Sequence, residues 1–330
     1  MSHPRDTFEL QGVEAQDAAF LDALARGRLH HAWLLTGPEG VGKASFAYRA
    51  ARRLLGAAPD AAYGALGAAP EDTVSRLVAS RSHPDLMVLE RETVDGKTKK
   101  SIAVDAAREL PEFFAKAPGL APYRVAIVDS ADDLNDNSAN ALLKTLEEPP
   151  PRGVLFLVSH APGALLPTIR SRCRRLAFPP WPEEAVSRFV HARTGVAQEM
   201  AHRAARVSGG APGRALASLG DGGLDLDAAA EDIVNALPAV DAAALSTLAD
   251  RFRGSEGLAR FLIFFEHLGA HLALRAEGLA EAPGQAALWA DAWSQAGRTA
   301  AAAEALNLDR TDVLWTTVAG LKRVAGGRPC

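Results

Sequence analysis

Short apolar runs alternate with stretches of helical period over the first half of the chain. The segments 31–36 and 123–129 are almost entirely apolar or β-branched, which is typical of strands buried on both faces of a parallel sheet. Further strands are expected at 86–89, at 154–158 and after 165–175, and helices at 14–27, 43–55, 71–81, 103–117 and 135–148. Strands that alternate with helices in this way predict an α/β fold with a doubly wound parallel sheet.

The pattern changes after the proline-rich segment 179–182. From there to the C-terminus the apolar positions recur with helical spacing, apart from a glycine-rich break at 220–223. We therefore expect a sheet domain over 1–179, a small helical domain over 180–221 and a larger helical domain over 222–330.

Three segments of the first half are less regular. Residues 56–70 are rich in Ala, Gly and Pro and are expected to form a loop, and residues 91–100 are expected to form a polar connector. Pro111 removes a backbone donor inside the helix expected at 103–117, so this interval either kinks or divides into two short helices.

The composition is that of an ordinary globular protein, with 48% hydrophobic and 23% charged residues in a chain of 330. A formal net charge of −4 argues against a mainly basic surface, so any DNA contact has to come from a local cluster of Lys and Arg. The two cysteines, Cys173 and Cys330, cannot form a multi-cysteine zinc module, and no metal is expected. The absence of a signal-peptide pattern and of an apolar run of membrane-spanning length predicts a cytoplasmic protein with no membrane partner.

A glycine-rich segment, GPEGVGKA at 37–44, follows the first expected strand and precedes a helix. This order is the setting of a phosphate-binding loop of the pattern G-x-x-x-x-G-K-[ST], in which backbone N–H groups surround the phosphates and the lysine reaches the β- and γ-phosphates. The predicted nucleotide-binding residues are Gly37, Gly40, Gly42 and Lys43. The alternative is an ordinary glycine-rich turn.

The chemistry of this loop is incomplete in two places. Ala44 replaces the hydroxyl that binds Mg²⁺, and Ser45 is turned away by about 100° on the helix. Asp129 ends an apolar strand where a Mg²⁺-binding aspartate is expected, but Ser130 stands where a catalytic carboxylate would follow. Asp129 is either a remnant of a Mg²⁺ site or a cap of the turn after its strand. The expected cofactor is therefore ATP or ADP with Mg²⁺, or none, and hydrolysis by this chain is not expected.

Two sequence blocks resemble those of a known protein family. NALLKTLEEPP at 140–150 and LPTIRSRC at 166–173, separated by a strand that ends in Ser159, strongly resemble the clamp-loader branch of the AAA+ proteins. Weaker matches lie at 30–33, 83–85 and 104–105, and the resemblance covers about residues 20–215. It implies an AAA+ P-loop sheet domain, a small helical lid and an all-helical C-terminal collar through which subunits associate.

The resemblance also assigns roles to single residues. Arg172, in the sequence Ser-Arg-Cys, matches the arginine finger that such subunits offer in trans to the ATP of a neighbour. Ser159 matches the first sensor position, and Arg214, after the Gly-Pro turn at 209–213, matches the second. The alternatives are a solvated basic run around Arg172 and an ordinary helix N-terminus at Arg214, while Cys173 reads as a small buried apolar residue.

The sequence thus predicts a non-hydrolysing clamp-loader subunit. The resemblance implies motor subunits, a clamp-opening subunit, the sliding clamp and primed DNA as partners. One alternative is an active ATPase motor in which Ser45 or water replaces the missing ligand and Asp132 the missing carboxylate; another is a nucleotide-sensing interaction protein unrelated to replication. Many relatives carry a four-cysteine zinc module after the P-loop helix, but residues 56–82 contain no cysteine, so no zinc is expected there.

Overall fold

The computed structural model describes residues 3–94, 97–99, 101–220, 222–254, 256–279 and 281–329. Contacts divide the chain into two compact units, one of Met1–Ala185 with Gly209–Arg214, and one of Val186–Ser208 with Ala215–Cys330. The predicted three-domain division stays a prediction. Asp221, in the expected break, and Cys330 lie outside the described residues.

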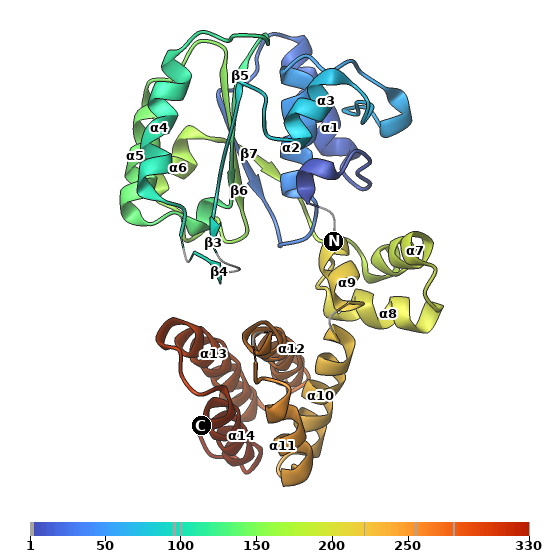
Figure 1. Cartoon of the computed structure of the whole chain (residues 1–330). Helices are drawn as coiled ribbons and strands as arrows, with labels where there is room; N and C mark the ends of the chain where they lie inside the picture. Colours follow the sequence, from blue (N-terminus) through green and yellow to red (C-terminus); the bar gives the residue numbers. More distant parts are fainter. Residues whose placement is uncertain are drawn as a thin grey trace. The chain divides into compact units, whose positions relative to one another are not determined.

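A five-stranded sheet forms the centre of the first unit (Figure 1), in the order β2-β5-β6-β1-β7. Each neighbouring pair is parallel. The strands are β1 (Ala32–Thr36), β2 (Leu86–Glu90), β5 (Arg124–Asp129), β6 (Gly153–Ser159) and β7 (Arg174–Ala177). The predicted parallel α/β sheet is therefore confirmed. The connector expected at 91–100 was wrong in part, because it contains a short antiparallel pair, β3 (Thr93–Val94) and β4 (Lys97–Thr98).

Helices cover both faces of this sheet (Figure 1). On one side lie α1 (Glu14–Ala25), α2 (Lys43–Leu54) and α3 (Thr73–Ala79), and on the other α4 (Val104–Ala115), α5 (Asp136–Glu147) and α6 (Pro167–Arg172). Short 3₁₀ turns are η1 (Pro4–Asp6), η2 (Ala61–Tyr63) and η3 (Ala131–Asp133). The parallel sheet covered on both faces, followed by an all-helical C-terminal region, confirms the predicted α/β fold class.

Successive strand residues enter different cores, which explains why the strands are apolar throughout. In β6, Phe156 packs with the α1 and α2 side, while Leu155 and Leu157 pack with the α4 and α5 side. Trp33 and Leu34 of β1 divide in the same way. Because side chains alternate across a strand, a sheet covered on both faces needs apolar residues at every position.

The helix α4 runs unbroken from Val104 to Ala115 and contains Pro111. The alternative of two short helices was therefore wrong. Ala107, Leu110 and Phe114 of this helix are buried in the core on that face of the sheet. This burial offsets the one backbone hydrogen bond that the proline removes.

A buried carboxylate connects β2 to the loop before β5. Asp85 is fully buried and accepts backbone N–H groups of Gly119, Leu120 and Ala121 at 2.8, 2.8 and 3.0 Å, and Arg124 Nε lies 3.4 Å from its Oδ1. Burial alone would raise the pKa of Asp85, but these donors and the guanidinium outweigh it and hold the pKa below its usual value. The match at 83–85 thus includes a structural anchor.

After β7, the regular elements among the described residues are all helices. They are α7 (Glu183–Thr194), α8 (Gln198–Val207), α9 (Pro212–Ser218), α10 (Gly223–Ala236), α11 (Ala242–Asp250), α12 (Gly257–Glu277), α13 (Pro283–Leu306) and α14 (Arg310–Ala325). The core of the second unit lies among α10–α14, where the rings of Phe252, Phe261, Phe264 and Phe265 meet in edge-on and tilted contacts. The expected helical pattern and its break before α10 are confirmed.

By length and composition, α12 could cross a membrane, so the expectation of no such apolar run was wrong. In the described chain this helix packs against α10 and α13, and 44% of its most apolar window is buried. Its apolar character is explained by its place in the helical core, because a core helix can be as long and as apolar as a helix that crosses a membrane.

Asp85 provides a test of the sheet unit. Asp85→Ala should lower its free energy of unfolding by about 3 kcal/mol or more, because three N–H groups and Arg124 lose their acceptor. Urea denaturation checks this, with exposed Asp105→Ala as the matched control. The pKa of Asp85 is lower in the folded state than in the unfolded state. The stability that its carboxylate contributes is therefore fully present above the unfolded pKa of about 3.9 and is lost as the pH falls through the folded pKa. Equal losses in both variants would contradict the anchor.

Candidate functional site

The glycine-rich loop joins the end of β1 to the start of α2, as the sequence predicts. Gly42 is the residue before the helix and Lys43 its first residue. Gly40 has a φ of +81° and approaches the backbone of Arg214 so closely that a Cβ would lie 2.8 Å from its N atom. The loop can therefore reach this position only with glycine at 40.

Lys43 is bound by its own chain. Its side chain is buried, and Nζ donates to the carbonyl oxygens of Gly37 and Pro38, each at 2.6 Å, and lies 2.9 Å from His160 Nδ1. An ammonium has three N–H groups. All three therefore have acceptors within the loop and at the end of β6, and a phosphate oxygen has to displace one of them.

The charges around Lys43 fit this arrangement. Burial lowers the pKa of Lys43 to about 8, against the opposing effect of Glu39, Asp129 and Asp132. Burial, together with the charge of Lys43, also lowers the pKa of His160. Neutral His160 can accept at Nδ1, which places its ring proton on Nε2.

Asp129 ends β5 near Lys43 but is a poor cation ligand in this setting. Burial and the nearby charge of Glu90 raise the pKa of Asp129 to about 6, while Lys43 opposes the shift. Ala44 supplies no oxygen, and Ser45, the next hydroxyl, is buried. The loop keeps the glycines of the predicted phosphate cradle, and the binding of a nucleotide there stays a prediction.

Ser130 and the acidic residues after it form a turn. Ser130 Oγ donates to Asp133 Oδ2 at 2.8 Å, and Arg91 lies 3.4 Å from the same carboxylate oxygen. Asp133 is therefore occupied by the turn that follows β5.

Asp132 ties that turn to the end of β6. It accepts from Ser159 Oγ at 2.9 Å and from the backbone N–H groups of His160 and Ala161 at 2.6 and 3.1 Å. The hydroxyl of Ser159, at the predicted first sensor position, is thereby engaged. Asp132 already accepts three donors, which leaves it poorly placed as a replacement catalytic base.

Arg214 is brought to the loop by a backbone contact. Gly213 donates its N–H to the carbonyl of Gly40 at 2.8 Å. Burial lowers the pKa of Arg214, and the charge of Glu39 opposes this shift. The structure thus brings Arg214 to the loop that carries Lys43, as the second sensor assignment requires, and the role itself stays a prediction.

Arg172 ends α6, which covers the opposite face of the sheet from α2 (Figure 1). Its guanidinium donates to the carbonyl of Thr168 at 3.1 Å and pairs with Glu147 of α5 at 2.9 Å. About a third of the Arg172 side chain and half of that of Glu147 are exposed. A pair this exposed contributes little stability, so Arg172 can exchange Glu147 for another anion.

The arginines next to Arg172 make different contacts from it and from one another. Arg174 lies over the ring of Trp33 at 4.7 Å, and Arg175 donates to Thr36 Oγ1 at 3.0 Å. Arg170 is exposed. Burial raises the pKa of Cys173 to about 12, so its thiol stays protonated. The basic run therefore consists of four arginines in distinct surroundings.

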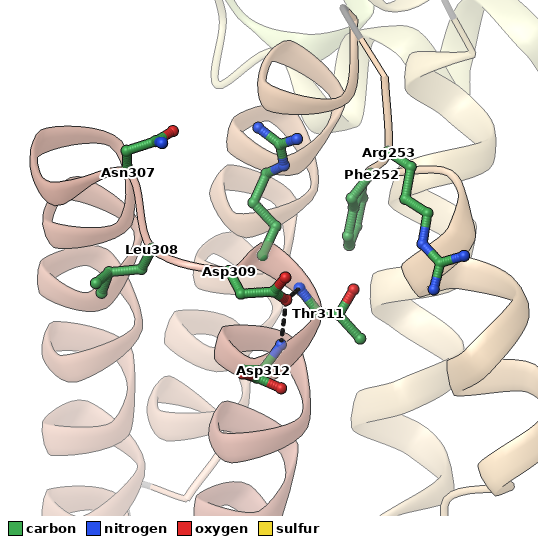
Figure 2. A pocket seen from close by; sticks show the side chains of 8 residues that line it. Phe252, Arg253, Asn307, Leu308, Asp309, Thr311 and Asp312 are labelled. Carbon is green, nitrogen blue, oxygen red and sulfur yellow. Dashed lines mark hydrogen bonds between the residues drawn. The ribbon is translucent and has the colours of Figure 1, made fainter.

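The second unit contains a separate polar cavity of about 510 Å³ between the segment at Phe252 and the turn from α13 to α14 (Figure 2). Asp309 accepts from the N–H groups of Thr311 and Asp312 at 2.8 and 3.0 Å, and the Asp312 N–H first of all holds the pKa of Asp309 below its usual value. Its carboxylate caps α14. The cavity thus follows from a helix turn and contains no recognisable catalytic set.

His160 and Glu147 were missed by the sequence reasoning. His160 follows the sensor position directly, but nothing in the sequence shows that its ring turns to Lys43. Glu147 lies in the first family block, and only the packing of α5 on α6 reveals its pair with Arg172.

Comparison with known proteins identifies the family of this chain. The profile of the family described as DNA polymerase III, delta subunit, matches residues 14–182, which are 169 of the 330 residues. The chain belongs to this family. Within the clamp-loader branch, the altered loop predicts a resemblance to the delta-prime subunit of bacterial DNA polymerase III, and the match confirms it.

Two individual relatives are also subunits of DNA polymerase III by name. The chain is 38% identical over 198 residues to the DNA polymerase III subunit delta′ of Pseudomonas aeruginosa, covering 60% of this chain and 58% of the relative. It is 33% identical over 265 residues to the subunit gamma/tau of Mycobacterium tuberculosis, covering 73% and 44%. The chain thus spans little more than half of the first relative and less than half of the second.

A crystal structure of a DNA polymerase III, gamma subunit-related protein from Thermotoga maritima also matches. It has 17% identity and a TM-score of 0.44, and the match covers 93% of this chain and 99% of that one.

The close approach at Gly40 gives a prediction. Gly40→Ala should lower the free energy of unfolding by about 2–4 kcal/mol, from the positive φ together with the clash against the Arg214 backbone. Gly27→Ala is the matched control, since Gly27 also has a positive φ but nothing within 4 Å of a Cβ, and should cost only about 1–2 kcal/mol. Urea denaturation compares the two, and equal costs would show that 213–214 does not pack on the loop.

Proposed function

We propose that this chain is a non-hydrolysing subunit of a DNA polymerase III clamp loader. It provides Arg172 to the ATP site of a neighbouring motor subunit and helps to place a sliding clamp on primed DNA. The observation that carries the proposal is the closed environment of Lys43, whose three N–H groups all have acceptors in its own chain.

The loss of hydrolysis is supported by four positions together. Ala44 offers no Mg²⁺ ligand, Ser130 offers no carboxylate, burial raises the pKa of Asp129 to about 6, and the oxygens of Asp132 are occupied by the end of β6. Phosphoryl transfer depends on positioning and on charge stabilisation by such groups. Asp132 and Asp133, the two carboxylates that follow Ser130, are both engaged by hydrogen bonds within the turn and at the end of β6. These positions argue against the active-motor alternative.

The finger role is supported by the exposed pair of Arg172 with Glu147 on the α5 and α6 face. A planar guanidinium suits the oxygens of a phosphate, and an arginine finger acts by neutralising charge that develops in the transition state. Exchange of Glu147 for a phosphate on an adjoining subunit would allow Arg172 to act outside its own nucleotide loop.

Assembly through the helical region is supported by its surface. Among described residues, seven large apolar side chains are exposed, and five of them belong to α12–α14 or the turn at Leu308: Leu274, Trp293, Leu306, Leu308 and Trp315. Exposed apolar residues of this size favour burial against a partner. We accordingly propose motor and clamp-opening subunits as partners, in the cytoplasm, as part of the polymerase III holoenzyme.

The isolated chain should hydrolyse no ATP. Ala44→Ser should not create turnover either, because the carboxylate at 130 is still missing. Titration of labelled ATP with and without Mg²⁺ should show binding that is weak and insensitive to Mg²⁺, and Lys43→Ala should weaken it by about tenfold or more. Steady turnover that Lys43→Ala abolishes would instead identify the chain as a motor.

Arg172→Ala should lower ATP turnover in the assembled complex but leave assembly intact. The rate at the one site it completes should fall by about 10³-fold or more, and the total rate by the share of that site. Arg170→Ala is the matched control, since Arg170 is exposed on the same helix. ATP turnover is measured on the assembled complex, and size-exclusion chromatography shows whether the complex still assembles. Unchanged turnover in Arg172→Ala refutes the finger, and failure to associate with clamp-loader subunits refutes the wider proposal.

A further inference from the structure

Four side chains of metal-ligand type meet between α10 and α12 in the second unit. Asp227 and Glu231 lie one turn apart on α10, and His267 and His271 lie one turn apart on α12. Spacing of four residues places each pair on one face of its helix. The two helices pack against each other, so the two faces meet.

The distances bring one carboxylate and one imidazole into direct contact. His271 Nε2 lies 2.9 Å from Asp227 Oδ1, and His267 Nδ1 lies 3.7 Å from the same oxygen. One ligand atom each of Asp227, Glu231 and His271 lies within 4.8 Å of the others. The cluster thus offers two carboxylates and an imidazole within reach of one point.

The second oxygen of Asp227 is the independent sign of a ligand. The Asp227 side chain is 2% exposed, and its Oδ2 is buried without a hydrogen-bond partner among the described residues. A buried carboxylate oxygen without a donor is costly. If the pair with His271 were only a helix cross-link, this oxygen would remain unsatisfied, whereas a cation can coordinate it.

Glu231 opens the cluster to solvent. Its side chain is 41% exposed, and its Oε2 lies 3.4 Å from Arg206 Nη2. The His271 side chain is 13% exposed, a fraction between those of the exposed Glu231 and the buried Asp227. A cation can therefore enter from the Glu231 side, with Arg206 as its competitor for that carboxylate.

We propose that Asp227, Glu231 and His271 bind one divalent cation of the Zn²⁺ type and that the cation joins α10 to α12. A nitrogen ligand with two carboxylates suits Zn²⁺ better than Ca²⁺ or Mg²⁺, which prefer oxygen ligands alone. Bonds of about 2.0–2.2 Å place ligand atoms no more than about 4.4 Å apart. The observed spread of up to 4.8 Å therefore needs only a small further approach of the ligand atoms, and His267 Nδ1 lies 3.7 Å from Asp227 Oδ1, the oxygen that His271 also contacts.

The test uses the untagged full chain, dialysed against a chelator and then titrated with ZnCl₂ by calorimetry, with bound zinc counted by mass spectrometry. We expect one Zn²⁺ per chain. Asp227→Asn removes the charge but keeps the shape of the side chain. Asp227→Asn and His271→Ala should each weaken Zn²⁺ binding by at least about tenfold. His191→Ala, which removes an exposed histidine of α7, is the matched control and should bind as wild type.

Two further readouts separate a ligand from a structural role. Arg206→Ala should strengthen Zn²⁺ binding, since it frees Glu231 and removes a positive charge, whereas a purely structural cluster would not respond. Saturating Zn²⁺ should raise the thermal midpoint of the wild type but not of Asp227→Asn. Affinity should fall as the pH is lowered, because protons compete with the cation for its ligand atoms.

Zinc uptake that neither Asp227→Asn nor His271→Ala reduces would overturn the proposal as non-specific surface binding. Absence of saturable uptake by the folded wild type would overturn it in favour of a carboxylate and imidazole cross-link. Circular dichroism of each variant shows whether it is folded, and Glu231→Gln, at the more exposed ligand, tests the site where a buried variant fails to fold.

Discussion

The burial of the parallel sheet on both faces is the constraint on which the candidate site depends. Strands β1, β5 and β6 lie beside one another in the sheet, so their carboxyl ends meet at the same edge. The loop of Lys43, the end of β5 at Asp129 and the end of β6 at Ser159 are brought together there. With two apolar layers around it, this edge is partly shielded from water, which explains the shifted pKa values of Lys43 and Asp129.

Within that edge the chain satisfies its own polar groups. Lys43 is held by its loop and by His160, and Asp132 holds Ser159 and the first residues after β6. In an ATPase such groups would have to remain available to phosphate, magnesium and water. These internal pairs join the loop after β1 and the turn after β5 to the end of β6, and the loop after β1 has Ala44 in place of a hydroxyl.

Arg172 belongs to a different surface and to a different kind of environment. It depends on the contact of α5 with α6, is partly exposed and has a partner that solvent screens. The helical unit is organised around a cluster of packed phenylalanines. Asp227 and its two histidines form a polar cluster between two of its helices.

The sequence by itself determined the α/β character, the strands at β1 and β5, the helical second half and the altered loop, because apolar period and glycine spacing are local properties. It could not determine that α4 continues through Pro111, since the burial of Leu110 and Phe114 is tertiary. Nor could it determine the partners of Lys43, Asp132 and Arg172. Those pairs join residues 117, 27 and 25 positions apart (43 to 160, 132 to 159, 147 to 172), and only the packing of strands and helices brings them together.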